Sequence, residues 1–219
     1  MFTTGTEWTT AITDLINAFA ILVPVIWLIR QKPLTKRNKL WATAFAMLMV
    51  TSLVGFLLHG IVMSNLVNGI LWCGFYLFLT FMVCTYVIAI KHDIYPDKDF
   101  SHSIKVNLIV AVLVSILLGI ARFTIRKYAV VFFSVYAMAN LINCVSLLRR
   151  QVRERPAFKW YIAAIAVLFV GSLLQSIKTI HFTLIWEFNY NAVYHWVMLL
   201  FVLIQFKGVL LVGKEFERT

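Results

Sequence analysis

The chain has 219 residues with 20 lysines and arginines against nine acidic residues, and 62% of it is hydrophobic while only 13% is charged. Soluble domains carry about 25% charged residues, and a single core of this size hides only part of its apolar surface, so the composition excludes an ordinary water-soluble domain. A bilayer accepts such a surface, and we predict an all-α integral membrane protein. The basic residues stand in short loops between apolar runs, where they set topology, so nucleic-acid binding is not expected.

Seven apolar runs are long enough to cross a bilayer, which takes about 20 residues at a rise of 1.5 Å each. They are continuous and lack the alternation of a transmembrane β-strand. We therefore predict one membrane domain, residues 1–219, built as a seven-transmembrane helix bundle. In chain order the predicted spans cover residues 8–29, 40–63, 69–90, 104–121, 128–148, 160–182 and 191–213.

Lysine and arginine predict the orientation, because loops rich in them stay in the cytoplasm. Fourteen fall in the tail, which includes Arg218, and in the loops after the first, third and fifth spans. Three fall on the other side, namely Arg122, Arg126 and Lys127. We therefore expect the N-terminus outside and the C-terminus in the cytoplasm, in a multi-pass protein of a bacterial cytoplasmic membrane.

Polar side chains inside a membrane are costly and mark sites, and those of five predicted helices gather near the outer end. The helix at 40–63 runs outward and places His59 about four residues, or roughly 6 Å, from its outer end. The helix at 191–213 begins outside, with Asn191 and His195 on one face because residues four apart are neighbours. The inner half offers less, chiefly Ser146, Gln205 and Lys207. The remaining outer candidates, taken as ligand-binding, are Asp14, Asn17, Trp72, Lys178, His181 and Glu187.

Three interpretations of this outer layer stay open. In one, His59 and His195 share a metal ion or a proton, with Asn191, Glu187 or His181 as a third partner. Imidazole is the commonest metal ligand, and a catalytic zinc takes three protein ligands and a water. In another the cavity binds a polar ligand without metal, and in the last each histidine only bonds to a neighbouring helix. A shared ion requires the two imidazoles to lie within about 8 Å of each other.

Longer side chains near the predicted membrane interfaces have interpretations of their own. Lys178 either pairs with Asp14 or Glu187 or extends its ammonium group to the membrane surface. Tryptophan prefers the boundary between lipid and water, and four tryptophans predicted to anchor the bundle there are Trp8, Trp160, Trp186 and Trp196.

Two short stretches each hold one of the paired histidines. Gly55-Phe-Leu-Leu-His59 lies on the second predicted helix and Asn191-Ala-Val-Tyr-His195 on the seventh. With them the chain resembles the seven-helix superfamily of alkaline ceramidases and progestin/adiponectin-type receptors (CREST type), which keeps Ser-x-x-x-His and His-x-x-x-His there. The resemblance implies zinc bound by His59 and His195 and hydrolysis of a lipid amide. The motif is degenerate in three places. Asn191 stands where the superfamily has its first histidine on the seventh helix, and Gly55 stands where it has the serine on the second helix. The helix at 69–90 has no aspartate, whereas the superfamily has one on its third helix.

Two classes of function follow from these observations. In the first, the protein is a hydrolase-like or receptor-like member of that superfamily, in which His59, His195 and Asn191 activate a water against a lipid amide or ester. Without its metal, the same pocket would bind a small amphipathic ligand. In the second, the chain is a small-solute transporter or a membrane subunit of a larger complex, which a continuous polar path through the inner half would favour. Membrane lipids are expected partners in both.

Overall fold

The computed structural model describes residues 1–216, except for the side chains of Arg126 and Lys127. The predicted placements of these two side chains and of Arg218 therefore lie outside the described residues. Within the described part the structure has seven helices, each long and apolar enough to cross a membrane, which confirms the predicted helix count. The elements are α1 (Gly5–Ile29), α2 (Lys36–Gly60), α3 (Asn65–Ile94), α4 (Ser101–Thr124), α5 (Arg126–Gln151), α6 (Phe158–Ser176), β1 (His181–Thr183), β2 (Glu187–Asn189) and α7 (Tyr190–Phe216).

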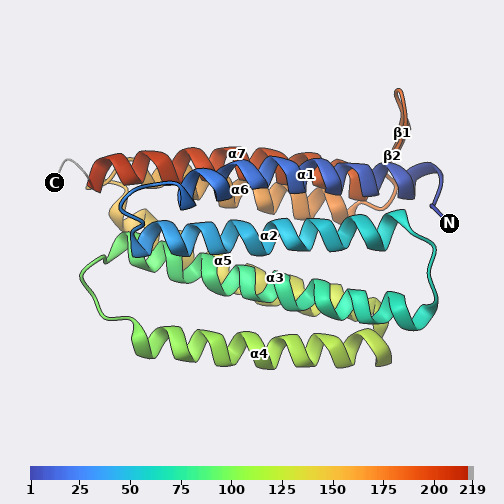
Figure 1. Ribbon diagram of the computed structural model, residues 1–219, viewed down its shortest axis with the longest axis horizontal. Helices are drawn as coiled ribbons and strands as arrows, with labels where there is room; N and C mark the ends of the chain where they lie inside the picture. Colours follow the sequence, from blue (N-terminus) through green and yellow to red (C-terminus); the bar gives the residue numbers. More distant parts are fainter. Residues whose placement is uncertain (217–219) are drawn as a thin grey trace.

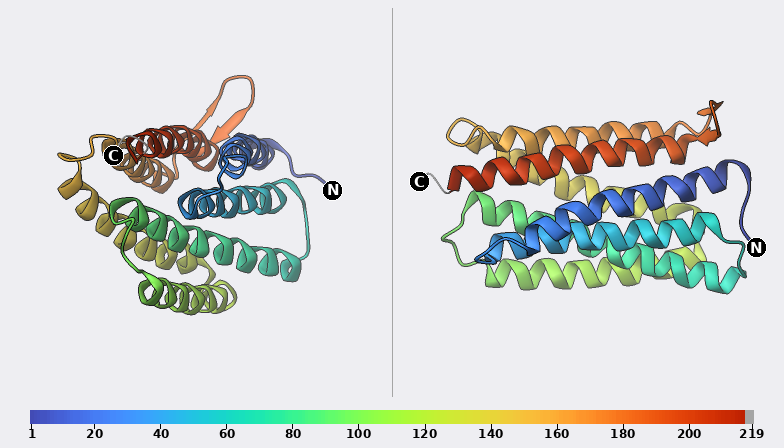
Figure 2. Two further views of the ribbon diagram at one scale, coloured as in Figure 1. Left: turned by 60° about the vertical axis from the view of Figure 1, so that its left-hand side comes forward. Right: turned by 45° about the horizontal axis from the view of Figure 1, so that its top comes forward.

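The helices run back and forth along one common direction, so that the chain termini lie at opposite ends of the bundle (Figures 1 and 2). The N-terminal end is formed by the starts of α1, α3, α5 and α7 and by the ends of α2, α4 and α6. The C-terminal end is formed by the opposite helix termini. α1 packs on α2 and α7, α3 lies among α2, α4 and α5, and α6 pairs with α7. α4 lies at the margin of the bundle (Figure 1).

Polar capping residues set the starts of three helices. The side chain of Thr35 accepts a hydrogen bond from the first turn of α2, and that of Ser64 accepts one from the first turn of α3. The side chain of Asn189 accepts two bonds from the first turn of α7, at 2.9 and 3.0 Å. A cap satisfies backbone N–H groups that have no partner inside the helix, so each helix begins where such a residue interrupts the apolar run.

Helix boundaries agree with the predicted spans within a few residues, with two informative differences. The prediction for the sixth span was wrong over its last residues, because α6 ends at Ser176 and residues 181–189 form a β-hairpin. Hydropathy had counted residues 177–182 as helix, but these include aromatic and β-branched residues, which also favour paired strands. α3 continues to Ile94, beyond the predicted end at residue 90, and so contains Asp93.

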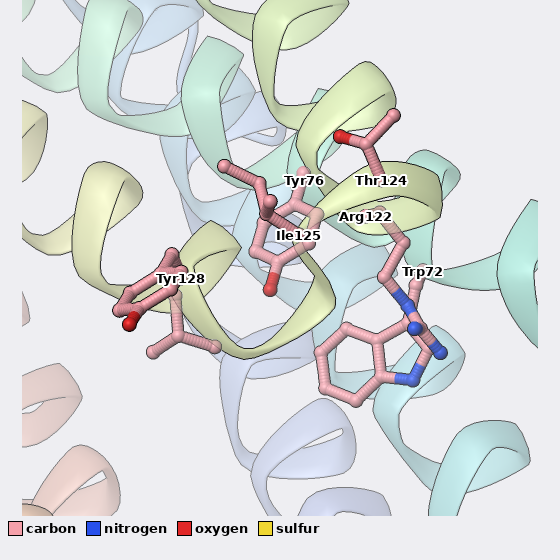
Figure 3. A pocket seen from close by; sticks show the side chains of 7 residues that line it. Trp72, Tyr76, Arg122, Thr124, Ile125 and Tyr128 are labelled. Carbon is pink, nitrogen blue, oxygen red and sulfur yellow. The ribbon is translucent and has the colours of Figure 1, made fainter.

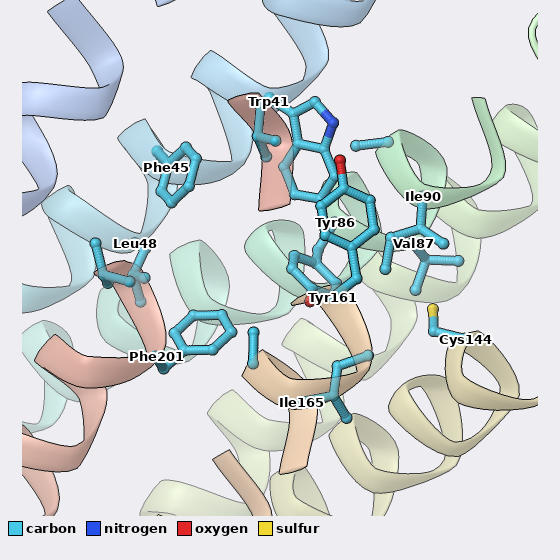
Figure 4. Packing of buried hydrophobic residues seen from close by; sticks show 14 of the residues in the cluster. Trp41, Phe45, Leu48, Tyr86, Val87, Ile90, Cys144, Tyr161, Ile165 and Phe201 are labelled. Atoms are coloured by element: carbon cyan, nitrogen blue, oxygen red, sulfur yellow. The ribbon is translucent and has the colours of Figure 1, made fainter. Parts of the chain in front are cut away.

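The main core fills the bundle between α2, α3, α6 and α7 (Figure 4). Its aromatic centre is Trp41, whose ring centroid lies 5.5 Å from that of Tyr86 and 5.1 Å from that of Tyr161. Phe201 extends the cluster, 6.2 Å from Tyr86. α3 is the most buried helix, whereas α4 and α5 leave most of their apolar residues on the surface.

Candidate functional site

The two histidines singled out from the sequence lie side by side at the N-terminal end of the bundle. The ring centroids of His59 on α2 and His195 on α7 are 6.4 Å apart, with the rings inclined by 66°. The predicted proximity is therefore confirmed, although the two residues are separated by more than a hundred positions in the chain.

His195 is held by one face of α1. Its Nε2 lies 3.4 Å from Asp14 Oδ1 and its Nδ1 lies 2.9 Å from Thr13 Oγ1 and 3.3 Å from the Thr10 carbonyl oxygen. Asn17 Nδ2 donates to the backbone carbonyl of His195 over 2.9 Å. These α1 residues are three and four positions apart, so they point the same way. The predicted candidates Asp14 and Asn17 therefore belong to this site.

A glycine on α2 makes room for the Asp14 carboxyl group. A Cβ atom at Gly55 would lie 2.5 Å from Asp14 Oδ2, closer than any real contact. Asp14 is buried between α1 and α2 as a result. The absence of a side chain at Gly55 thus has a steric consequence, because it lets a carboxylate approach the imidazole of His195.

His59 faces the more open side of the pair. Its Nδ1 lies 2.8 Å from Glu7 Oε2, with 18% of the His59 side chain and 51% of the Glu7 side chain exposed. The ring centroid of Trp72, a predicted candidate on α3, lies 6.4 Å from that of His59. Glu7 was not among the predicted site residues, because it precedes the first predicted span. Its position seven residues before Asp14 could have indicated it, because seven residues nearly complete two helical turns.

The arrangement consists of two carboxylate–imidazole pairs that face each other, Glu7 with His59 and Asp14 with His195. A carboxylate orients an imidazole and selects its tautomer, which is what a general base requires. Thr13, His195 and Asp14 have the order of a nucleophile–base–acid triad. The Thr13 hydroxyl, however, is buried and donates to the Thr10 carbonyl over 2.8 Å, so it presents no nucleophile to a substrate.

The predicted zinc set is not assembled by the residues that the structure describes. Among residues 1–216, no three His, Cys, Asp or Glu side chains are grouped as a metal site would require. A catalytic zinc takes three protein ligands, and His59 and His195 with a third partner were the expected ones.

The other four candidates lie in the first turn of α7 and in the segment that precedes it. Asn191, in the first turn of α7, accepts a hydrogen bond from Gln175 Nε2 over 3.2 Å and so faces the end of α6. Lys178, His181 and Glu187 are exposed in the segment between α6 and α7. The predicted helical position of His181 was wrong, because this residue lies on β1. Glu187, which precedes the seventh predicted span, lies on β2. Within residues 1–216, His181 and Glu187 do not group with the two imidazoles as a metal site would require, and the Asn191 side chain bonds to Gln175 instead.

A groove opens beside the site, between α3 and the turn from α4 to α5, with a volume of about 610 Å³. Trp72, Tyr76 and Tyr128 supply aromatic walls, and Arg122 supplies a positive charge (Figure 3). Arg122 Nη2 donates to Asn68 Oδ1 over 2.7 Å, and its guanidinium carbon lies 5.7 Å from the centroid of the Trp72 ring. Pockets for small ligands typically measure about 300–1,000 Å³, so the groove has the size of a binding site.

A second buried polar cluster, at the C-terminal end, was not predicted. The carboxylate of Asp93 accepts from Arg37 Nε and Trp41 Nε1, each over 2.9 Å, and from the Tyr161 hydroxyl over 2.5 Å. Arg37 Nη2 also donates to the Val209 carbonyl over 2.7 Å. Asp93 is completely buried, and its hydrogen-bonding capacity is used within the bundle. The cluster ties α2, α3, α6 and α7 together.

The expectation that the inner half holds few polar groups was wrong. It followed from placing Asp93 in a loop, whereas the helix extends past it. Deeper in the bundle, Tyr86 donates to Gln205 Oε1 over 2.7 Å. Lys207 places its ammonium 3.8 Å from the centroid of the Trp160 ring, near the C-terminal end. These groups are separate cross-links between helices.

Comparison with protein families matches residues 9–214 to the Family of unknown function (DUF6962). The chain belongs to this family. The matched residues run from the second turn of α1 to the last turn of α7, and so include both histidines, Asp14, the groove and the Asp93 cluster. Comparison with curated proteins and with solved structures found no match.

Proposed function

We propose that the seven helices span the cytoplasmic membrane of a bacterium, with the N-terminal end of the bundle outside and the C-terminal end in the cytoplasm. The apolar surfaces of α4 and α5 suit contact with lipid tails. Of the 20 lysines and arginines, only Arg122, Arg126, Lys127 and Lys178 belong to the N-terminal end, which is the asymmetry of cytoplasmic and external loops. In this orientation the histidine pair and the groove lie in the outer leaflet.

The function that the site supports best is binding of an amphipathic small molecule with a negatively charged head group and one apolar chain. The walls of the groove are aromatic and aliphatic, which suits an apolar chain, and Arg122 supplies the charge for the head group. A groove that opens between helices at membrane depth can receive such a ligand directly from the lipid.

The position of Trp72 carries this proposal. Its ring lies 5.7 Å from the guanidinium carbon of Arg122 and 6.4 Å from the ring of His59, and it also lines the groove. The Trp72 ring therefore separates a head group bound at Arg122 from the Glu7–His59 pair. Trp72 thus lies between the groove and the histidine pair.

The Glu7–His59 pair favours a second candidate function, hydrolysis of an ester or amide bond in that ligand. His59 would act as the general base that removes a proton from water, with Glu7 orienting its ring. The water oxygen would bond to the carbonyl carbon of the ligand, the bond from that carbon to the leaving oxygen or nitrogen would break, and the protonated His59 would return the proton to the leaving atom. This retains the lipid-hydrolase chemistry implied by the resemblance to alkaline ceramidases, and its step requires only residues of this chain.

Binding can be measured by the quenching of tryptophan fluorescence with a brominated fatty acid, on protein held in phosphatidylcholine nanodiscs. Trp72→Phe should remove much of the quenching, whereas Trp160→Phe, at the opposite end of the bundle, should preserve it. Arg122→Gln should weaken binding about ten- to hundredfold, the effect of losing a charge-assisted hydrogen bond. Equal quenching in both tryptophan variants, or an unchanged affinity of Arg122→Gln, would refute the proposal.

Hydrolysis is tested separately by the release of fatty acid from a lysophospholipid and from an N-acyl amine, with and without a metal chelator. The second candidate predicts release that resists the chelator and is lost in His59→Gln. Ligand binding without any release would eliminate the hydrolase and leave the binding protein.

A further inference from the structure

The β-hairpin between α6 and α7 presents an ordered apolar tip. β1 and β2 are antiparallel, and Phe182 pairs with Phe188, their rings stacked with centroids 5.3 Å apart and planes inclined by 12°. The tip is Leu184-Ile185-Trp186, and the Leu184 N–H donates to the Trp186 carbonyl over 3.2 Å. Cross-strand aromatic pairs stabilise a hairpin, so the tip is held away from the bundle by its own strands.

The three tip residues are large and apolar, yet their side chains are mostly exposed. Leu184 is 76% exposed, Ile185 87% and Trp186 60%. The segment 182–186 carries no charged residue. Lys178 and His181 lie at the base of the hairpin, whereas Glu187 directly follows the tip and pairs with Thr183. The Glu187 carboxylate lies beside Gly5 at the start of α1, where a Cβ atom would be 3.0 Å from its Oε2. Contiguous apolar residues that protrude from a fold mark an interaction surface. Tryptophan at the end of an otherwise aliphatic tip is the composition found at the boundary between lipid and water.

The direction of the hairpin indicates which surface it meets. Figures 1 and 2 show it leaving the bundle sideways at the N-terminal end, across the helix axes. Its base is attached inside the bundle, because Asn189 accepts a hydrogen bond from the Thr10 hydroxyl over 3.2 Å. Thr10 is five residues into α1, about 8 Å from its first residue. The hairpin therefore projects in the plane of the membrane at the level of the outermost helical turns.

We infer that the tip residues Leu184, Ile185 and Trp186 insert into the outer leaflet, at the boundary between lipid head groups and acyl chains. The inference rests on the membrane insertion proposed above and adds a lipid-binding element outside the helices. Lys178 and His181 at the base, and the Glu187 carboxylate beside the start of α1, stay at the aqueous surface while the tip reaches lipid. Because Asn189 ends the hairpin and caps α7, the anchor also fixes the helix start that carries His195.

The test places an environment-sensitive fluorophore on single cysteines of the whole protein in nanodiscs. Ile185→Cys is the probe, Leu113→Cys on the exposed face of α4 is the control for lipid contact, and Asp97→Cys in the loop before α4 is the control for water. All three carry Cys73→Ala, since the other two cysteines are buried. Discs of ordinary phosphatidylcholine are compared with discs whose acyl chains are brominated, because bromine quenches only a fluorophore within the lipid.

The inference predicts that the Ile185 label is quenched and blue-shifted like the Leu113 label, while the Asp97 label is unchanged. If the Leu113 label is quenched and the Ile185 label behaves like the Asp97 label, the hairpin inference fails and membrane insertion stands. If the Leu113 label is not quenched, membrane insertion itself fails. Shielding of the Ile185 label only in discs with two protein copies would assign the tip to a protein interface and would also overturn the inference.

Discussion

The Asp93 cluster permits the most quantitative prediction. Asp93→Ala removes the acceptor of hydrogen bonds from Arg37, Trp41 and Tyr161 and leaves the Arg37 guanidinium without its counter-charge. Breaking a buried ion pair from one side costs about 3–5 kcal/mol, because the remaining charge stays desolvated. A chain of this size loses about 2–4 °C per kcal/mol, so we expect the midpoint of thermal unfolding to fall by about 6–20 °C.

A graded series makes the source of this loss identifiable. Tyr161→Phe removes one hydrogen bond to the same carboxylate and should cost about 1.5–3 kcal/mol. The double variant Arg37→Met with Asp93→Ala should be more stable than Asp93→Ala alone, because the unpaired guanidinium is gone, and the two residues should show a coupling energy of about 0.5–3 kcal/mol.

Thermal unfolding of purified protein in a mild detergent, followed by circular dichroism at 222 nm, gives the required midpoints. Asp97→Asn, an exposed acidic residue in the following loop, is the matched control and should stay within about 0.5 kcal/mol of the parent. If Asp93→Ala unfolds like Asp97→Asn, the cluster does not hold the four helices together and the reasoning is refuted.

Two further predictions concern the approach of helices at the histidine pair. Gly55→Ala places a methyl group 2.5 Å from Asp14 Oδ2 and should destabilise the protein by about 1–3 kcal/mol in the same thermal assay. The control is Gly74→Ala, where a Cβ atom meets nothing within 4 Å. This variant should be neutral or stabilising by up to about 1 kcal/mol. Equal midpoints for the two variants would contradict the steric argument. Asn189→Ala removes the cap of α7 and should cost about 0.5–2 kcal/mol, seen as faster hydrogen exchange in the first turn of α7 and unchanged exchange in α2.

The end of the bundle at which His59 and His195 lie could be predicted from the sequence, but the directions of the candidate side chains around each helix could not. Alternation of seven spans places His59, at the end of α2, and His195, near the start of α7, at the same end of the bundle. An amphipathic helix reveals its buried side by a polar stripe, and these spans are apolar all round. The sequence alone therefore could not exclude Asn191 from the pair, and the fold turns it toward Gln175 on α6.

What the sequence determined by itself was the number of helices and the membrane-protein character, because hydropathy accumulates along the chain and needs no partner. Tertiary structure decided what surrounds the two imidazoles. Glu7 reaches His59 across 52 positions, and Asp14 fits beside His195 only because α1 and α2 touch at a glycine. The tertiary structure also showed that the apolar residues after α6 form a hairpin. Hydropathy could not predict this, because a strand forms only when a second strand pairs with it. Contacts between distant residues arise from packing, and hydropathy has no information about packing partners.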